Sequence, residues 1–317
     1  MKKREVLARI FAKIEAAESI VIFGHVNPDG DCVGSVIGLK KELQFLFPDK
    51  KIYGVGSRPS YLPSFLEPAE EVKDETISHS LAVLVDLNTI SRVEDKRVSL
   101  ALDKVCFDHH ILKENPGFLV YHEEKAPSAT YVITKAFRER YHQISSEAAT
   151  YFFLGLITDT ANFQLNAEPS TLRMAAYLVS LGVDYRSIFN ELYRQSRKEL
   201  LFRSSLYQKI QFSGRVAYAI LRKVDYEPYS IPPAEVGEKV DLLSRIDHHP
   251  IWVLFSENAD ATVRVEYRSD GSYNMQKVAS MFGGGGHFSA SGCPQKDFSK
   301  VEEILAALNA LPLEKEA

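Results

Sequence analysis

Cysteine is scarce, net charge is small and long hydrophobic runs are missing from this 317-residue sequence. The three cysteines, Cys32, Cys106 and Cys293, form no CxxC motif and cannot all pair, which fits a reducing cytosol better than a disulfide framework. We interpret them as small buried side chains. No segment approaches the roughly 18 apolar residues of a membrane span, and the basic N-terminus lacks the apolar region of a signal peptide. We therefore expect a cytoplasmic globular protein that binds no membrane.

The balance of charges limits the partners of the protein. Lys and Arg number 38 against 42 Asp and Glu, a formal net charge of −4, so a general electrostatic grip on duplex DNA is not expected. A nucleic-acid substrate would have to be short or held locally. The length corresponds to about two domains of roughly 150 residues each, and a hydrophobic content of 45% is sufficient for their cores.

Apolar runs of strand length alternate with helical periodicity in the first part of the chain. This alternation predicts an α/β fold whose mostly parallel sheet is flanked by helices. We expect strands at residues 19–23, 51–55, 80–86 and 104–108, and helices at residues 6–14, 33–47, 128–141, 146–158 and 170–181.

A charged, helix-compatible segment at residues 185–208 is interpreted as a helical linker. It separates an N-terminal domain of residues 1–184 from a smaller C-terminal α/β domain of residues 209–317. In the latter we expect strands at residues 215–222, 251–256 and 261–268, and a helix-compatible stretch at residues 234–246.

Acidic and imidazole side chains follow the first expected strand. His25, Asp29 and Asp31 lie within seven residues directly after it, and strand ends of open α/β sheets are where ligands bind. Because Asn-Pro-Asp-Gly is also strong turn chemistry, a polar turn is an alternative interpretation.

Two further strand ends repeat this placement. Asp86 follows one apolar strand, and Asp108, His109 and His110 close the next, so three strands deliver acids or imidazoles at their carboxyl ends. Taken singly, Asp86 could cap a helix and the histidines could lie in a solvated loop. Asp159 ends an expected helix, where an acid opposes the helix macrodipole and favours a nearby cation, unless it begins an exposed loop.

Four aspartates and two histidines without a thiolate form a hard oxygen and nitrogen ligand set. Such a set suits Mn²⁺ or Mg²⁺ more than structural zinc, and the imidazoles favour Mn²⁺. Asp29, Asp31, Asp86 and Asp159 would repel one another, and two divalent cations supply the matching four positive charges. Paired cations of this kind activate water and stabilise an in-line phosphoryl displacement.

The ordered motifs from residue 25 to residue 292 resemble two linked families. The set His25-x-x-Pro-Asp29-Gly-Asp31-x-x-Gly-Ser, Asp86, Asp108-His109-His110 and Thr-Asp159-Thr is similar to the DHH phosphoesterase superfamily. The segment Phe-Gly283-Gly284-Gly285-Gly286-His287 resembles the DHH-associated C-terminal domain of the NrnA-like oligoribonuclease and adenosine bisphosphate phosphatase branch.

This resemblance implies roles for individual side chains. His25, Asp29 and Asp86 would hold one Mn²⁺, while Asp31, Asp86, His109 and Asp159 would hold the second, with Asp86 bridging and a hydroxide between the metals as nucleophile. His110 would contact the substrate phosphate. Asp108 would orient a neighbouring imidazole. The sequence leaves the oligomeric state open, and a homodimer is one alternative.

The same resemblance assigns substrate contacts to the second domain. Residues 283–286 carry no side chain beyond hydrogen, so their amides can approach an anion closely, and His287 can add a donor or a charge; a flexible turn is the alternative. Arg268 would grip a terminal phosphate. Arg92 is either a phosphate contact or a solvated arginine.

Two features depart from this simple picture. Asp247-His248-His249 repeats the motif letters but precedes a strand and has no acidic strand ends nearby, so we interpret it as a loop. The family usually has glycine after Thr-Asp-Thr, and Ala161 stands there instead. The shape of the pocket next to Ala161 is therefore expected to differ, while the metal ligands are unaffected.

The resulting prediction is a two-domain, two-metal phosphoesterase with its active site in the cleft between the domains. Its expected substrates are short RNA oligonucleotides and 3'-phosphoadenosine 5'-phosphate (PAP). Hydrolysis of cyclic di-AMP or its linear product pApA is the alternative within the same chemistry. A pyrophosphatase and a RecJ-like exonuclease are disfavoured by the glycine motif and the short chain, and a non-catalytic nucleotide sensor is disfavoured because the ligand set is complete.

Overall fold

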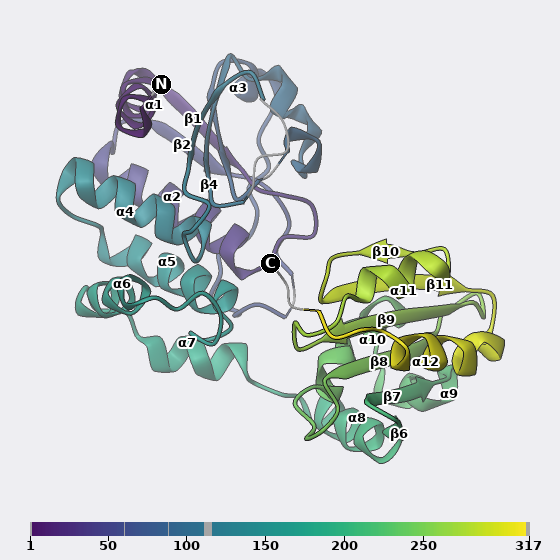
Figure 1. Ribbon diagram of the computed structural model, residues 1–317. Coiled ribbons are helices and arrows are strands. Elements are labelled where there is room, and N and C mark those ends of the chain that lie inside the picture. The colour runs from purple at the N-terminus through teal and green to yellow at the C-terminus, as the bar shows by residue number, and fades with distance from the viewer. Residues whose placement is uncertain (1, 60, 88, 111–115, 315–317) are drawn as a thin grey trace. The chain divides into compact units, whose positions relative to one another are not determined.

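The computed structural model describes residues 2–59, 61–87, 89–110 and 116–314. They form two compact units that divide between Arg194 and Gln195, and the chain can be followed through both from purple to yellow in Figure 1. The division falls inside the segment expected to be a linker. Each unit has its own sheet and its own buried apolar clusters.

The first unit is built on a five-stranded sheet in the order β2-β1-β3-β4-β5, with every neighbouring pair parallel. The strands are β1 (Ser19–Phe23), β2 (Lys51–Gly54), β3 (Leu81–Val85), β4 (Asp103–Asp108) and β5 (Leu119–His122). The parallel sheet and its first four strands agree with the prediction. The sequence does not reveal β5, because this edge strand is only four residues long and mostly half-buried.

Both faces of the parallel sheet are covered. Ile20 and Ile22 pack into one apolar cluster, whereas Val21 and Phe23 belong to the cluster on the opposite face. Because successive strand residues point to opposite faces, a strand buried on both sides reads as a continuous apolar run. The run Ser19–Phe23 is buried at every position for this reason.

Helices cover one face of this sheet, and shorter helical segments cover the other (Figure 1). The helices of the first unit are α1 (Lys3–Ala16), α2 (Gly30–Leu46), α3 (Asp74–Ser78), α4 (Ala129–Tyr141), α5 (Ser146–Asp159), α6 (Pro169–Ser180) and α7 (Tyr185–Leu192). Short 3₁₀ helices lie at Ile90–Arg92 and Lys96–Leu100.

Helices α2 and α5 approach each other closely through glycines. A Cβ atom at Gly34 would lie 2.5 Å from the carbonyl oxygen of Tyr151. A Cβ atom at Gly155 would lie 2.7 Å from Asp31 Oδ1 and would overlap Thr130. Only a residue without a side chain permits this backbone approach. The contact brings the start of α2 next to the end of α5, where two of the predicted ligands lie.

The second unit contains a six-stranded mixed sheet in the order β10-β11-β9-β8-β7-β6, in which β7 and β8 are parallel and the other pairs are antiparallel. Its strands are β6 (Gln211–Ser213), β7 (Val216–Leu221), β8 (Ile251–Glu257), β9 (Val263–Ser269), β10 (Gly285–Gly286) and β11 (Ala290–Gln295). The predicted strands correspond to β7, β8 and β9.

Helices of the second unit pack on both faces of its sheet. They are α8 (Arg197–Gln208), α9 (Lys223–Tyr226), α10 (Pro233–Val236), α11 (Met275–Met281) and α12 (Val301–Asn309), with 3₁₀ helices at Glu227–Tyr229, Gly237–Leu243 and Phe298–Lys300. Phe202 and Leu206 of α8 are fully buried in this unit. The helix-compatible stretch at residues 234–246 is a short α-helical turn followed by a 3₁₀ helix that ends at Leu243.

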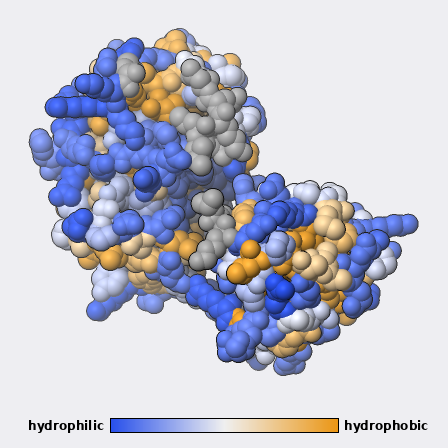
Figure 2. All heavy atoms as spheres, viewed as in Figure 1, coloured by the Kyte–Doolittle hydropathy of each residue, from blue (hydrophilic) through white to orange (hydrophobic). Residues whose placement is uncertain are grey.

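Hydrophilic residues cover much of the visible surface of each unit, with hydrophobic residues in smaller groups between them (Figure 2). Among the described residues, no helix combines the length and the apolar character needed to cross a membrane.

Candidate active site

The order of the strands places the predicted ligands at one edge of the sheet. The chain runs from β1 outward to β2 and then returns to add β3 on the other side of β1. Such a reversal of strand order creates a crevice at the carboxyl ends, where ligands bind in open α/β sheets. His25 follows β1 and Asp86 follows β3, so the two side chains flank this point.

His25 and Asp29 form one side of the site. His25 Nε2 lies 3.3 Å from Asp86 Oδ2 and 4.0 Å from Asp29 Oδ1. Asp29 Oδ1 also accepts hydrogen bonds from the backbone N–H groups of Asp31 and Cys32, each at 3.0 Å. Asp29 is therefore the N-cap of α2, as the turn interpretation of this loop implies, and its role as a metal ligand stays a prediction.

Asp86 lies at the centre of the cluster. Its carboxylate is buried, and Oδ1 lies 3.5 Å from both His109 Nε2 and His110 Nδ1. Oδ1 has no hydrogen-bond partner among the described residues. The backbone of Asp86 has φ +59°, a left-handed conformation that aspartate tolerates better than most residues. A buried acid with an unpaired oxygen and imidazoles on two sides is well suited to a cation.

The three residues of the Asp-His-His motif have different positions. Asp108 ends β4, is fully buried, and accepts a hydrogen bond from His110 Nδ1 through Oδ1 at 2.9 Å. His109 Nδ1 contacts the carbonyl oxygen of Ala126 at 3.2 Å, which directs Nε2 toward the aspartates. This nitrogen lies 3.5 Å from Asp159 Oδ2 and 3.9 Å from Asp31 Oδ2.

Asp31 is held by the first turn of α4. Its Oδ2 accepts from the N–H of Ala129 at 2.6 Å, and its Oδ1 accepts from the N–H and hydroxyl of Thr130 at 3.0 and 2.7 Å. A helix N-terminus stabilises an anion through such unpaired amides. The carboxylate is thereby fixed with almost no exposure to solvent.

Asp159 is the last residue of α5, and the chain turns sharply after it. Its Oδ2 lies 3.5 Å from His109 Nε2, and the nearby cation that the sequence favours for Asp159 stays a prediction. Ala161, Asn162 and Phe163 have φ values of +45°, +58° and +63°. Glycine adopts this region without strain, which explains why a glycine suits the position of Ala161.

Burial and mutual charge shift the pKa values of the cluster strongly. Burial disfavours imidazolium, but the Asp86 carboxylate outweighs it and raises the pKa of His25 to about 11 and that of His109 to about 10. Burial raises the pKa of Asp159 to about 6 and that of Asp31 well above its usual range. For Asp86, the two imidazoles overcome burial and hold the pKa below the usual range. The opposite charges of the imidazolium and carboxylate groups therefore favour one another across this buried cluster.

The cluster contains donor atoms of the kind that hold metal ions. Three groups of side chains could each hold a metal ion. Within each group, every residue contributes one donor atom, and these atoms lie within 4.8 Å of one another. The groups are His25 with Cys32 and Asp86, Asp86 with His109 and His110, and Asp31 with His109 and Asp159. Asp86 and His109 each belong to two groups, so the groups are contiguous. Carboxylate oxygens and imidazole nitrogens dominate, as Mn²⁺ or Mg²⁺ would require.

Backbone groups are the part of the site that sequence reasoning missed. The amides of Ala129 and Thr130 and the carbonyl of Ala126 hold Asp31 and His109. Every residue carries such groups, so the expected helix start near Ser128 is the only sequence feature that indicates them.

The sequence analysis interprets Cys32 only as a small buried side chain. It is buried, and its pKa is raised to about 11 by burial, yet its sulfur lies among donor atoms.

The remaining predicted residues lie outside this cluster. Arg92 is exposed, and its carbonyl accepts a hydrogen bond from the Val26 N–H, which ties its loop to the end of β1. In the second unit, Arg268 of β9 donates to Glu266 Oε2 at 3.1 Å. Gly285 and Gly286 form β10 against β11, and His287 directly after them is exposed.

Gly283 and Gly284 precede that strand. Gly283 has φ +79°, whereas a Cβ atom at Gly284 would collide with β11. The second Asp-His-His motif is a surface loop, as expected. Asp247 and His248 are among its most exposed side chains, with 91% and 88% of their surface accessible.

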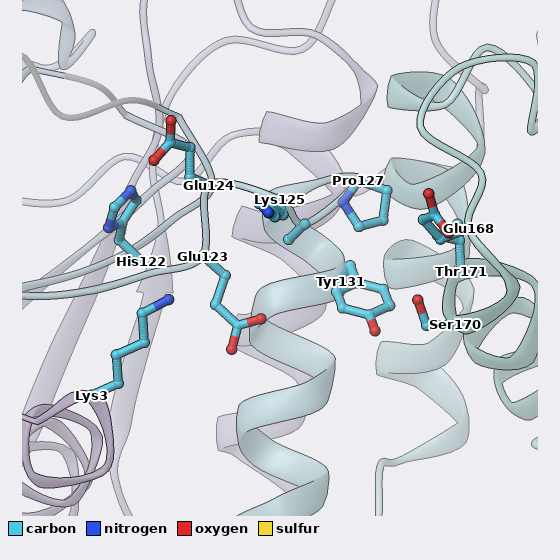
Figure 3. Close-up of a pocket in the computed structure, with 11 residues that line it drawn as sticks. Lys3, His122, Glu123, Glu124, Lys125, Pro127, Tyr131, Glu168, Ser170 and Thr171 are labelled. Atoms are coloured by element: carbon cyan, nitrogen blue, oxygen red, sulfur yellow. The ribbon is translucent and has the colours of Figure 1, made fainter.

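A separate cavity of about 530 Å³ lies beside the carboxyl end of β5 (Figure 3). Its wall contains acids and bases from α1, the 122–127 segment and the start of α6, namely Lys3, Glu123, Glu124, Lys125 and Glu168. None of the predicted site residues lines it. Its wall includes Ala126, whose carbonyl oxygen contacts His109 Nδ1.

Comparison with protein families identifies both units. Residues 19–156 match the N-terminal domain of the DHH family, and residues 213–312 match the DHHA1 domain. The first match contains His25, Asp29, Asp31, Asp86, Asp108, His109 and His110. The second contains Arg268, the glycine motif and His287.

Curated relatives extend over nearly the whole chain. It is 32% identical to the bifunctional oligoribonuclease and PAP phosphatase NrnA of Mycoplasma pneumoniae, covering 94% of each chain. It is 29% identical to the protein of that name from Bacillus subtilis, covering 96% of this chain and 97% of the relative. In fold it is similar to an exopolyphosphatase-related protein from Bacteroides fragilis, with a TM-score of 0.86, 21% identity and coverage of 96% and 97%.

Proposed function

Because this chain belongs to the DHH family, whose members hydrolyse phosphoester bonds, we propose that it is a metal-dependent oligoribonuclease and PAP phosphatase. Its substrates are RNA oligonucleotides of a few nucleotides and 3'-phosphoadenosine 5'-phosphate. The observation that carries the proposal is the convergence of His25, Asp31, Asp86, His109 and Asp159 at one sheet edge. The names of the relatives in Mycoplasma pneumoniae and Bacillus subtilis support the substrate class.

The ligand set is divided around Asp86. His25, Asp29 and Asp86 would hold one Mn²⁺, and Asp31, Asp86, His109 and Asp159 would hold a second. When bound, such cations lower the pKa of water and stabilise charge on phosphoryl oxygens. Asp86 has one oxygen toward His25 and the other toward His109, as a residue shared by both positions requires.

His110 and Asp108 act beside the ligands. Asp108 Oδ1 accepts a hydrogen bond from His110 Nδ1, so Nε2 remains to face a substrate phosphate. Because Asp108 is fully buried, this hydrogen bond fixes the ring orientation of His110. Asp108 is a positioning residue, and His110 is the group that contacts the substrate.

The second unit binds the distal end of the substrate in this proposal. Arg268 and His287 supply side-chain donors for a terminal phosphate. The N–H groups of Gly283 and Gly284, which the sequence analysis expects to approach an anion, instead donate to the carbonyls of Ser280 and Ala279. Short substrates suit a protein whose net charge is −4, because a few local contacts replace a long basic surface. The three buried free cysteines fit a reducing compartment, and we place the enzyme in the cytoplasm.

A turnover panel with the full chain tests this function. Metal-depleted protein reconstituted with Mn²⁺ is assayed on RNA dimers to pentamers, PAP, pApA and cyclic di-AMP under identical conditions. The expected result is release of mononucleotides from short RNA and of phosphate from PAP. Absence of turnover on every substrate, with two metals bound, would identify a nucleotide sensor instead.

A cyclic di-AMP or pApA phosphodiesterase is the second candidate. It is supported by 24% identity to the cyclic-di-AMP phosphodiesterase PdeA of Listeria monocytogenes, which covers 98% of this chain but 51% of that protein. Preference for cyclic di-AMP over both short RNA and PAP in the same panel would select this candidate.

A further inference from the structure

A sulfur atom lies beside the proposed metal position that contains His25. His25, Cys32 and Asp86 each offer one donor atom, all within 4.8 Å of one another, and the three residues are 6%, 1% and 3% exposed. We propose that Cys32 Sγ is a further metal ligand at this position and that it allows the position to bind Zn²⁺ or Cd²⁺ through nitrogen, sulfur and oxygen. The proposal deepens the metal-dependent function proposed above and rests on it for the presence of a cation at His25 and Asp86.

The backbone around Cys32 accommodates the sulfur. The N–H of His25 donates a hydrogen bond to Sγ at 3.3 Å. A Cβ atom at position 24 would overlap the sulfur, so Gly24 leaves the space that Sγ occupies. A backbone donor to a ligating sulfur orients it and disperses its charge. The sulfur thus has a defined location at the start of α2, next to the end of β1.

The distances are compatible with metal coordination after small side-chain movements. Zinc–nitrogen and zinc–sulfur bonds of about 2.0 and 2.3 Å place tetrahedral donor atoms roughly 3.3 to 3.6 Å apart. His25 Nε2 and Asp86 Oδ2 are already 3.3 Å apart. Sγ lies within 4.8 Å of both donor residues, so about an ångström of closure completes the three-ligand set. Asp29, 4.0 Å from His25 Nε2, offers a fourth ligand.

Ligand softness determines which metals use the sulfur. Zn²⁺ and Cd²⁺ bind thiolate readily, whereas Mn²⁺ prefers oxygen and nitrogen donors. On binding, the thiol proton leaves to solvent and the sulfur donates its electron pair to the metal, with no change in oxidation state. Loss of Cys32 should therefore weaken Zn²⁺ and Cd²⁺ binding far more than Mn²⁺ binding.

The other two cysteines provide internal controls. Cys106 is buried on β4, and Cys293 is buried in the second unit beside the hydroxyl of Tyr267. Among the described residues, neither belongs to a group of side chains that could hold a metal. A Cys106→Ala/Cys293→Ala variant retains Cys32 as its single thiol, and a Cys32→Ala variant retains the other two.

Ultraviolet absorption during Cd²⁺ titration tests the proposal without an activity assay. Chelator-treated full-length protein is titrated with Cd²⁺, and the sulfur-to-cadmium charge-transfer band is recorded for wild type and both variants. We expect the band to appear in wild type and in Cys106→Ala/Cys293→Ala and to be missing in Cys32→Ala. Displacement of bound Mn²⁺ by Zn²⁺ can be monitored through the electron paramagnetic resonance signal of Mn²⁺. Half-displacement in Cys32→Ala should require at least about tenfold more Zn²⁺ than in wild type.

Two results would overturn the assignment. One is Cd²⁺ bound to wild type, by equilibrium dialysis, without a charge-transfer band. The other is a band that persists in Cys32→Ala or is missing from Cys106→Ala/Cys293→Ala. The Cys106→Ala/Cys293→Ala measurement tests the assignment even if Cys32→Ala does not fold. A correct band in a protein without phosphoesterase turnover would instead contradict the proposed function and leave the sulfur ligand in place.

Discussion

At the scale of single residues, Asp86 is the side chain on which the proposed chemistry depends most. Its two oxygens face different histidines, 3.3 and 3.5 Å away, and its backbone is left-handed. Asparagine keeps the shape and tolerates the same backbone region, so Asp86→Asn removes the charge with little strain. We expect bound Mn²⁺ to fall below two per chain and turnover to drop at least about a hundredfold.

Metal analysis of the folded Asp86→Asn protein and its steady-state rates would check this expectation. The second Asp-His-His motif offers the matched control, since His248→Ala and His249→Ala alter an exposed loop. Both should stay within about threefold of wild type, well below the 1.4 kcal/mol of a tenfold rate change. Normal activity in Asp86→Asn would contradict a shared ligand.

Ala161 carries a local conformational cost. Its φ of +45° is unfavourable for a residue with a side chain, by roughly 1 to 2 kcal/mol, whereas glycine adopts it freely. Glycine loses more chain entropy on folding, so we expect Ala161→Gly to raise the free energy of unfolding by about 0.5 to 1 kcal/mol. Chemical denaturation measures this change. The control Ala149→Gly, inside α5, should be destabilising instead.

The sequence pattern predicts which acidic and imidazole side chains gather at the sheet edge, because the residue types themselves are visible in the sequence; their role as metal ligands stays a prediction. His25, Asp31, Asp86, His109 and Asp159 do lie together, while their assignment to two cations stays a prediction. The supporting amides of Ala129 and Thr130 could not be predicted, because a backbone N–H has no sequence signature.

At the scale of helices and strands, the approach of α2 and α5 brings together Asp31 and Asp159, the two ligands that we propose on these helices. Gly34→Ala would place a methyl group against the Tyr151 carbonyl, which belongs to the backbone and cannot rotate away. We expect a loss of about 1 to 2 kcal/mol in stability, even after the gain in helix propensity. Weaker Mn²⁺ binding should accompany it, because the two helices carry ligands.

Thermal unfolding and Mn²⁺ titration of Gly34→Ala provide the measurements. Phe45→Ala is the control on the same helix, since Phe45 is 55% exposed, and its stability should change by no more than about 0.5 kcal/mol. If the two variants behaved alike, the helix contact would not limit the site.

The strands that the sequence pattern predicts are those with continuous apolar runs, such as β1 and β3. β11 has the sequence Ala-Ser-Gly-Cys-Pro-Gln, which contains few strand-forming residues. It is a strand because it pairs with β9 from Ala290 opposite Arg268 to Gln295 opposite Val263. That pairing is a tertiary interaction, and no local pattern reveals it.

At the scale of the whole molecule, the proposal divides the chemistry between the two units. Arg268→Ala and His287→Ala should keep two Mn²⁺ per chain while kcat/KM for RNA dinucleotides falls roughly tenfold to a hundredfold, the scale of a lost charge-assisted contact. A small chromogenic phosphodiester should be much less affected because it makes no contact with the second unit. Equal losses on both substrates would refute the division.

Metal binding should also affect the entire protein. Removal of metal by a chelator should abolish turnover and lower the melting temperature, because bound cations stabilise the native state over the unfolded chain. Mn²⁺ should restore both better than Ca²⁺, whose larger oxygen shell suits this imidazole-containing set poorly. Full activity in excess chelator, with metal measured as absent, would exclude the mechanism. The Asp86→Asn protein should show little metal-dependent change in melting temperature.

The tethering of Asp31 by the start of α4 also has a consequence for biosynthesis. The amides that hold this carboxylate come 98 and 99 residues later in the chain, and Asp159 follows later still. Contacts of such long sequence separation form late, after local helices, and synthesis proceeds from the N-terminus. A nascent chain on the ribosome therefore cannot hold Asp31 in place or bring it together with Asp159 until α5 has emerged.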